Sequence, residues 1–343
     1  MSREPGLAAP TIDALLAPLT QFEAALLAVS GGPDSTALLA MAADWARRTP
    51  SAPRLAAATV DHGLRKESAA EAAAVGALCE RLGVPHRVLV WTGEKPASRV
   101  QERARTARYA LLVAEARAIG AGAIVVAHHL DDQAETALFR LLRGSGVGGL
   151  RARAAKTDLD GIALLRPLLG VAKSDLVAYC EARGLAFVRD PANEDPRYAR
   201  TRMRKLAKGL EIEGLDAAAL ARLARRAGQI EDALARQTEA ASARLGFARG
   251  ARCDAAALLA EPTEVVQRLL AAAIADVGGR PPSRVGLAKV EALTQRLERA
   301  YAAGATFSAN VAGARVRLAR GAVRVEPEPP RRSATAPRAR IDA

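Results

Sequence analysis

The sequence predicts an α/β protein, with a Rossmann-like parallel sheet followed by a mainly helical C-terminal domain. Two observations support this prediction. Short apolar runs alternate with longer amphipathic ones in the first half, and from about Gly209 the pattern changes to long stretches rich in Ala and Leu. The length of 343 residues fits about two domains. With 50% hydrophobic and 25% charged residues, the composition is that of a soluble protein with a buried core.

Five short apolar runs in the first half are candidate strands. They cover residues 24–29, 55–60, 86–91 and 123–127, with a weaker one at 185–188. The candidate helices between them cover residues 35–48, 68–82, 99–119, 132–142 and 173–183. Strands separated by helices form βαβ units, so the pattern predicts a parallel sheet with helices on both faces. Gly83, Gly120 and Gly184 each follow a candidate helix directly, where a C-cap is expected.

The second half has a different pattern. Helices are expected over residues 215–243, 262–277 and 283–302, and short strands over 306–310, 314–319 and 322–325. Arg320 and Gly321 are placed to form a hairpin turn. We therefore expect a catalytic domain at 1–209, a helical domain ending in a short β hairpin at 210–325, and a disordered, basic tail at 326–343.

The charge balance is strongly basic, with 50 Lys and Arg against 37 Asp and Glu, a net charge of +13. A polyanionic partner would explain this charge. A GC-rich genome is the alternative explanation, because 43 of the 50 are Arg. The segments 140–156 and 197–208 contain no acidic residue, whereas a solvated helix face normally mixes both signs. These two segments favour nucleic acid as the partner.

Several classes of protein are not expected. No apolar run approaches the roughly 18 residues of a membrane span, and the N-terminal segment does not resemble a secretory leader. Cys79, Cys180 and Cys253 are odd in number and widely spaced, without a CxxC pair. We therefore expect no disulfide framework, zinc site or iron–sulfur cluster, and a cytoplasmic location.

The segment 26–41, LLAVSGGPDSTALLAM, has the features of a phosphate-binding loop between a strand and a helix. Gly31 and Gly32 allow a tight turn whose N–H groups approach an anion closely. Ser35 or Thr36 would open the helix, whose N-terminus favours phosphate. Asp34 beside phosphates is explained if it holds Mg²⁺.

An ordinary strand–turn–helix connection is the alternative explanation of this segment, with Asp34 or Ser35 as a simple N-cap. The loop is neither a Walker A motif nor the dinucleotide-binding GxGxxG. The complete SGGxDS pattern is more restrictive than a pair of glycines. The candidate phosphate-binding residues are Ser30, Gly31, Gly32, Pro33, Asp34 and Ser35.

A second polar block, residues 128–136, follows the candidate strand at 123–127, where an open parallel sheet places its ligands. On a helix, Asp132, Glu135 and Thr136 lie on one face. Asp132 could share a Mg²⁺ ion with Asp34. The alternatives are that the acids only cap a helix and that His128 is a core residue. A transition-metal site is disfavoured, because a hard ion suits phosphate oxygens better.

SGGxDS after a strand is the signature of the PP-loop ATP pyrophosphatases. Together with further blocks, it makes the chain resemble one branch of them, the tRNA(Ile)-lysidine synthetases, over residues 24–208. The matching blocks are SGGPDS (30–35), VDHGLR (60–65), QERARTARYALL (101–112), AHHLDDQAETALFRLLRGSGVGGL (127–150), RPLL (166–169) and VRDPANEDPRYARTRMRKL (188–206).

The resemblance implies a ligase that uses ATP and Mg²⁺. Its partners would be L-lysine and an isoleucine tRNA with a CAU anticodon, and its products lysidine at the wobble cytidine, AMP and pyrophosphate. Residues 210–325 would contact the tRNA, although a packing or dimerisation module explains them nearly as well, and a homodimer stays an open alternative. No membrane is involved.

The resemblance also assigns roles to individual residues. Asp34 and Asp132 would be the required acids, and Arg202 the required cation beside the reacting base. The choice among Arg200, Arg202 and Arg204 stays open, because Thr201 and Met203 depart from the family's RYxRNRIR pattern. The residues expected to contact tRNA are Arg197, Arg200, Arg204 and Lys205.

Some questions stay open at this stage. A carboxylate, His128 or His129 could take the proton from the lysine amine. Recognition of an unstacked base uses aromatic or arginine planes. Because aromatic residues make up only 3% of the chain, arginine would supply most of this stacking, with Tyr109 and Tyr198, each flanked by arginines, as the exceptions. The rival functions are a PP-loop enzyme with another acceptor and a non-catalytic nucleic-acid-binding protein.

Overall fold

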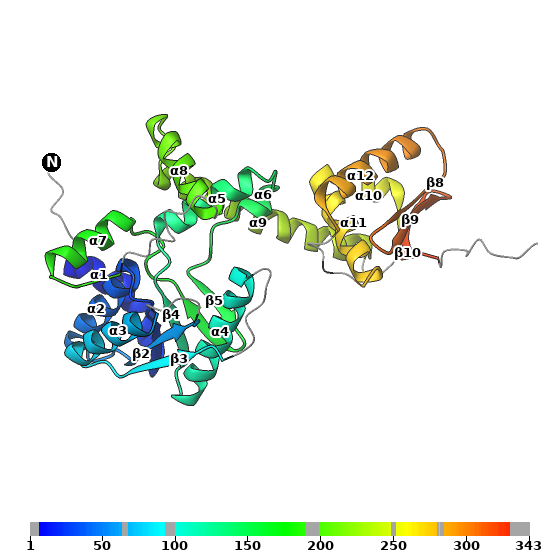
Figure 1. Cartoon of the computed structure of the whole chain (residues 1–343). Helices are drawn as coiled ribbons and strands as arrows, with labels where there is room; N and C mark the ends of the chain where they lie inside the picture. The colour runs from blue at the N-terminus through cyan, green and yellow to red at the C-terminus, as the bar shows by residue number, and fades with distance from the viewer. Residues whose placement is uncertain are drawn as a thin grey trace, which may run out of the picture. The chain divides into compact units, whose positions relative to one another are not determined.

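The chain folds into two compact units, Met1–Gly228 and Gln229–Ala343 (Figure 1). The structure is a computed structural model that describes residues 7–63, 68–92, 100–188, 199–247, 252–279, 281 and 285–329. Most of the predicted disordered tail therefore lies outside the described residues. None of the helices in these ranges is long and apolar enough to cross a membrane.

The first unit is built on a six-stranded sheet in the order β3-β2-β1-β4-β6-β5. All neighbouring strands are parallel except the pair β5 and β6, which is antiparallel. In chain order the strands are β1 (Ala24–Ala28), β2 (Arg54–Asp61), β3 (His86–Val90), β4 (Ala123–Val126), β5 (Lys156–Leu159) and β6 (Ile162–Leu165). The prediction of a parallel sheet is confirmed.

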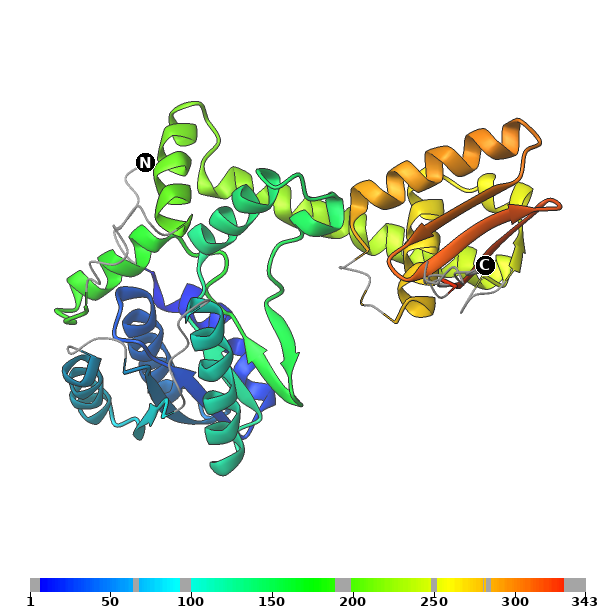
Figure 2. The same cartoon turned by 45° about the vertical axis from the view of Figure 1, so that its right-hand side comes forward.

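Helices cover both faces of this sheet, as Figure 2 shows for α2 and α4. The helical elements of the first unit are α1 (Ala9–Leu16), η1 (Ala17–Gln21), α2 (Pro33–Arg48), α3 (Ser68–Leu82), α4 (Val100–Ala118), α5 (Leu130–Leu141), α6 (Val147–Leu150), α7 (Lys173–Ala182) and α8 (Ala199–Ile212). The backbone is left-handed at Gly83, Gly120 and Gly184, with φ of 69°, 68° and 61°, as expected of C-cap glycines.

Alternate residues of the central strand β1 enter two different cores. Leu27 packs in a cluster with α2 and α7, whereas Leu26 packs with Leu112 of α4. All five residues of β1 are buried. A continuous apolar run is therefore what this strand requires, because a parallel sheet is covered on both sides.

Two features of the sheet differ from the prediction. The weak run at 185–188 forms no strand; instead the N–H of Val188 donates to the carbonyl of Gly31 at 2.8 Å. The sheet continues through the hairpin of β5 and β6, whose turn residues Asp160 and Gly161 have φ of 52° and 82°. Each of these strands has only four residues, too few for a clear hydrophobic period.

The first unit also extends beyond residue 209, where the sequence pattern suggested a boundary. Helix α8 was not predicted, and its Met203 and Ala207 pack against a cluster that contains Ala134 and Leu138 of α5. Leu220, at the start of α9 (Ala217–Leu245), joins the same cluster. Apolar contacts between α5, α8 and the start of α9 thus explain why the first compact unit ends at Gly228.

The second unit combines helices with a four-stranded antiparallel sheet in the order β7-β10-β9-β8. Besides the rest of α9, its elements are β7 (Arg252–Asp254), α10 (Ala255–Leu259), α11 (Thr263–Val277), α12 (Leu287–Ala302), β8 (Phe307–Val311), β9 (Ala314–Ala319) and β10 (Ala322–Pro327). Arg320 and Gly321 form the predicted turn, with φ of 51° and 70°. Strand β7 was not predicted; it is held by pairing with β10.

Candidate active site at the carboxyl ends of the first sheet

The phosphate-binding loop predicted from the sequence lies between β1 and α2. The N–H of Ser30 donates to the hydroxyl oxygen of Ser35 at 3.1 Å, and the hydroxyl of Ser35 donates to the carbonyl of Gly32 at 3.1 Å. Helix α2 begins at Pro33 with Gly32 as its N-cap, two residues earlier than predicted. Proline suits this position, because the first turn of a helix has N–H groups without partners. The N-terminus of α2 thus opens onto the loop.

The two glycines of the loop differ in their structural roles. Gly31 has a φ of +82°, and a Cβ there would lie 3.3 Å from Cγ2 of Val75. Gly32 has a φ of −73°, which any residue adopts. Among the described residues, the only atom within 4 Å of a Cβ on Gly32 would be the hydroxyl oxygen of Ser30, at 4.0 Å. The fold therefore needs glycine at 31, whereas at 32 it leaves the space beside the backbone open.

Replacing Gly32 with valine is expected to weaken ATP binding by roughly tenfold or more, a loss of about 1.4 kcal/mol. The branched side chain would fill the space through which the phosphates approach the N–H groups. Thermal unfolding should change little, since the described fold has room for the side chain. Isothermal titration calorimetry and differential scanning calorimetry check the two halves of this prediction.

Gly31→Ala is the matched control, because left-handed backbone costs an alanine roughly 1–2 kcal/mol. This variant should lower the Tm. If Gly32→Val loses as much thermal stability as Gly31→Ala, then Gly32 serves folding and not phosphate binding.

His129 draws three carboxylates together at the start of α5. Its Nε2 lies 3.4 Å from Oδ2 of Asp34 and 3.7 Å from Oδ2 of Asp132, and its Nδ1 lies 3.5 Å from Oδ2 of Asp131. Its side chain is only 3% exposed. Burial opposes the charged ring, but Asp131, Asp34 and Asp132 outweigh burial and raise the pKa of His129 to about 10. The two predicted acids, Asp34 and Asp132, therefore lie beside one imidazolium.

The third carboxylate has a structural partner. Oδ2 of Asp131 accepts a hydrogen bond from the N–H of Lys173 at 2.9 Å, at the first residue of α7. The N–H of Leu130 donates to the carbonyl of Val171 at 2.9 Å beside it. Asp131 thus joins the start of α5 to the start of α7. The cap of α5 itself involves Asp132, whose Oδ2 accepts a hydrogen bond from the N–H of the N-cap residue His129 at 3.2 Å.

The two carboxylate oxygens of Asp34 differ in their surroundings, since only Oδ2 lies beside His129. Its Oδ1 is buried and has no hydrogen-bond partner among the described residues. No group of three or more His, Cys, Asp or Glu side chains in that part of the chain is arranged to hold a metal ion. Asp34 and Asp132 both lie within 4 Å of Nε2 of His129, and in nucleotide-dependent Mg²⁺ sites one or two carboxylates share the ion with the phosphates.

The surroundings of His128 are electropositive. Burial lowers the pKa of His128 to about 3; Asp132 opposes this shift, and Arg153, Arg166 and Arg105 add to it. The neutral ring has a buried Nδ1 without a hydrogen-bond partner in the described part of the chain. This side of the site is therefore suited to an anionic ligand.

The predicted RNA-contacting residues fall into different environments. Nε of Arg204 donates to Oε1 of Glu135 at 2.5 Å, which joins α8 to α5. Arg202 and Lys205 are exposed on α8. Arg200 lies in the first turn of α8, and Arg197 lies outside the described residues, as does Tyr198. Arg204 thus forms a contact between α8 and α5, and the side chains of Arg202 and Lys205 are exposed.

Sequence reasoning did not single out two arginines near His128, Arg105 and Arg166. Arg166 is buried and donates to the carbonyl of Ala154 at 2.8 Å and to the hydroxyl of Thr157 at 3.2 Å. Both arginines stand in matched blocks of the sequence, QERARTARYALL and RPLL. Neither arginine lies in the acid-free basic segments 140–156 and 197–208, so the clustering of charge along the chain does not point to them.

The three cysteines are packed in the cores of the two units. All three are buried and free, and burial raises the pKa of each to about 11. Cys180 donates to the carbonyl of Pro33 at 3.4 Å from beneath α2. The thiols are therefore protonated at neutral pH and serve as packing groups.

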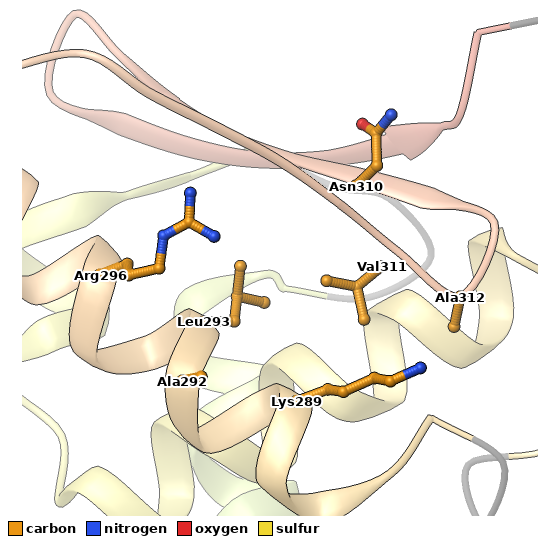
Figure 3. A pocket seen from close by; sticks show the side chains of 7 residues that line it. All are labelled: Lys289, Ala292, Leu293, Arg296, Asn310, Val311 and Ala312. Carbon is orange, nitrogen blue, oxygen red and sulfur yellow. The ribbon is translucent and has the colours of Figure 1, made fainter. Parts of the chain in front are cut away.

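Two cavities lie in the second unit. One of about 310 Å³ lies between α12 and the hairpin of β8 and β9, and one of about 360 Å³ lies between α9 and α11. Figure 3 shows the first, where Leu293 and Val311 form an apolar floor and Lys289 and Arg296 stand at its sides. No residue of the phosphate-binding loop lines either cavity.

Comparison with known proteins agrees with the geometry of the loop. The family model described as PP-loop domain matches residues 8–210. Among solved structures, the U34-tRNA thiolase NcsA from Methanococcus maripaludis, which contains a [4Fe-4S] cluster, matches 64% of this chain and 78% of its own, with a TM-score of 0.55. At 15% sequence identity, this likeness indicates a shared fold alone.

Two curated relatives are similar over almost their whole length. The tRNA(Ile)-lysidine synthase of Methylobacterium sp. (strain 4-46) is 50% identical over 313 residues, which cover 90% of each chain. That of Bradyrhizobium sp. (strain BTAi1) is 44% identical over 345 residues, covering 95% of this chain and 96% of the relative. With the SGGPDS loop and the carboxylates of α2 and α5 in place, the chain belongs to the tRNA(Ile)-lysidine synthase family of PP-loop proteins.

Proposed function

We propose that this protein joins L-lysine to C2 of the wobble cytidine in the CAU anticodon of an isoleucine tRNA. The reaction consumes ATP, passes through an adenylated cytidine, and releases AMP and pyrophosphate. The observation that supports it best is the meeting of Asp34 and Asp132 on His129, because it unites the two sequence blocks most typical of the family.

The reaction has two steps that make different demands on the site. In the first, the carbonyl oxygen of cytidine C2 bonds to the α-phosphorus of ATP, and pyrophosphate leaves. In the second, the lysine ε-amine bonds to C2, loses a proton, and AMP leaves. Negative charge grows on pyrophosphate in the first step, where N–H groups fixed in advance stabilise it best. Ser30 to Ser35 and the N-terminus of α2 would supply these N–H groups.

The carboxylates would hold a magnesium ion with the phosphates. Asp34 and Asp132 would supply hard oxygen ligands. Oδ1 of Asp34, which has no hydrogen-bond partner among the described residues, could coordinate the ion. The ion would neutralise charge on the departing pyrophosphate. His129 keeps both carboxylates in place through its contacts of 3.4 and 3.7 Å.

The RNA would be bound partly through α8. Arg197, Arg200, Arg204 and Lys205 are the proposed contacts, with Arg202 beside the reacting base. The exposed side chains of Arg202 and Lys205 are consistent with these roles. We place the reaction in the cytoplasm, where the three free cysteines stay reduced.

The test is AMP release with a transcript of the isoleucine tRNA, with and without lysine. Lysine-dependent AMP release and incorporation of labelled lysine into the tRNA are expected. AMP release with another acceptor in place of lysine would identify a different PP-loop enzyme. Binding of tRNA without any ATP turnover would identify a non-catalytic RNA-binding protein.

Removal of divalent cations with EDTA should abolish AMP release, and added Mg²⁺ should restore it. The reason is that two carboxylates near the phosphates repel them unless a cation lies between. Binding of tRNA, measured in the same buffer, should survive the treatment. Full turnover in EDTA would exclude the proposed role of Asp34 and Asp132 as magnesium ligands.

A further inference from the structure

Three arginines stand side by side across the sheet of the second unit. In the strand register, Arg324 of β10 is opposite Arg252 of β7 on one side and opposite Arg317 of β9 on the other. Ser308 of β8 is opposite Arg317 and completes the line across all four strands. We call Arg252, Arg324 and Arg317 the arginine row.

The arginine row lies on the outer face of the sheet. The residues that alternate with these arginines, such as Cys253, Val323 and Leu318, are buried in the core of the second unit with α11 and α12. The three arginines and Ser308 are all exposed. Because successive side chains of a strand point to opposite faces, the row projects away from that core.

This arrangement is unfavourable for the isolated protein. Side chains directly opposite each other on antiparallel strands have Cβ atoms about 4.5–5.5 Å apart, and like charges there destabilise the sheet. The row contains two such pairs in succession. A sheet with no function on this face would be expected to place an acid or a neutral side chain at one of the three positions.

Of the three arginines in the row, only Arg317 has an acidic partner on this face among the described residues. Glu326 accepts a hydrogen bond from Nε of Arg315 at 2.7 Å, and lies 3.6 Å from Nη1 of Arg317. Asp254 caps α10 by accepting from the N–H of Ala257 at 2.9 Å. No carboxylate in the described ranges forms an ion pair with Arg252 or Arg324.

We propose that the arginine row binds the phosphate backbone of the tRNA. This inference rests on the proposed function for the identity of the polyanion. Strands are spaced about 4.8 Å apart, so the row presents guanidinium groups along a line of about 10 Å. A guanidinium matches a phosphate with two parallel hydrogen bonds. The outer-face positions in line with the row are arginine or serine, without an aromatic ring, which favours contact with backbone and not with bases.

The test compares two double variants of the full chain. Arg252→Gln with Arg324→Gln removes two charges from the row. Arg236→Gln with Arg299→Gln removes two exposed charges from α9 and α12 of the same unit and is the matched control. Filter binding of the tRNA transcript at a series of salt concentrations measures the affinity and its salt dependence.

The row variant should bind tRNA more weakly than the control variant at low salt. Its slope of log affinity against log salt should fall by about 0.7–0.9 for each arginine–phosphate pair that the substitutions remove. Its Tm at low salt should equal or exceed that of the wild type, because a repulsive pair is removed. This combination, weaker RNA binding without loss of stability, is not expected if the row has a structural role.

The outcomes separate this inference from the proposed function. Equal affinity and equal salt slope in the two double variants would overturn the inference, whatever the enzyme's activity. If poly-glutamate binding depends on the row while tRNA binding does not, the surface is for an acidic protein, which also overturns it. Failure of lysine-dependent AMP release in the wild type would contradict the proposed function alone, because the binding measurement needs no turnover.

Discussion

Replacing Asp34 or Asp132 with asparagine is expected to lower the rate of AMP formation by about 100-fold or more, the size found when one charge-stabilising group is removed. Both substitutions keep the size of the side chain but remove the charge that would hold Mg²⁺ beside the phosphates. Binding of tRNA should change little, since neither residue belongs to an exposed basic segment. Single-turnover AMP release and filter binding measure the two effects.

Asp131→Asn is the control for both variants. An asparagine oxygen can still accept the hydrogen bond from the N–H of Lys173, so the joint between α5 and α7 survives. The substitution weakens the attraction to Nδ1 of His129, which lies 3.5 Å from Oδ2 of Asp131. His129 contacts the proposed magnesium ligands but is not itself one of them. The rate should fall much less than in the other two variants. Near-normal turnover of Asp34→Asn or Asp132→Asn in saturating Mg²⁺ would rule out the metal role for that residue.

Arg202→Ala is expected to lower the rate of the chemical step by about 100-fold while tRNA affinity falls only slightly. A cation beside the reacting base acts mainly in the transition state, so its removal affects the rate and not binding. Arg202→Lys should rescue little, because a point charge does not replace a planar fork. Pre-steady-state AMP formation with saturating tRNA isolates this step.

Arg204→Ala provides the contrast, because this guanidinium is paired with Glu135 at 2.5 Å. Its removal would leave a largely buried carboxylate unpaired, so the Tm should fall together with the activity, by roughly 2–4 °C for each 1 kcal/mol of stability. The reverse pattern, in which Arg204→Ala loses the chemical step at an unchanged Tm and Arg202→Ala does not, would move the essential cation to Arg204.

Much of the first unit could be predicted from the sequence, because its information is local. An apolar strand followed by SGGPDS specifies a turn, a helix start and an anion site within about a dozen residues, and β1 and α2 have almost the predicted bounds. Helix α8 was missed because its basic residues hid the apolar positions Met203 and Ala207, which face α5. A charge pattern and a packing pattern shared the same segment.

Other features depend on contacts that sequence spacing does not contain. The role of His129 arises because Asp34 reaches it from another helix. The arginine row joins residues 252, 317 and 324, and only the register of the strands places them opposite one another. Charged residues that lie side by side on different strands form no run of charge along the chain, so the sequence alone does not reveal them.

The burial of all three cysteines has a practical consequence for labelling this molecule. Thiolates, and not thiols, react with maleimide and iodoacetamide, so groups with a pKa of about 11 inside two cores stay inert at neutral pH. The three native cysteines are therefore expected to take up no label in site-specific labelling. A single Ser308→Cys substitution, at the exposed end of the arginine row, would take one fluorophore and report directly on the arrival of RNA at that sheet.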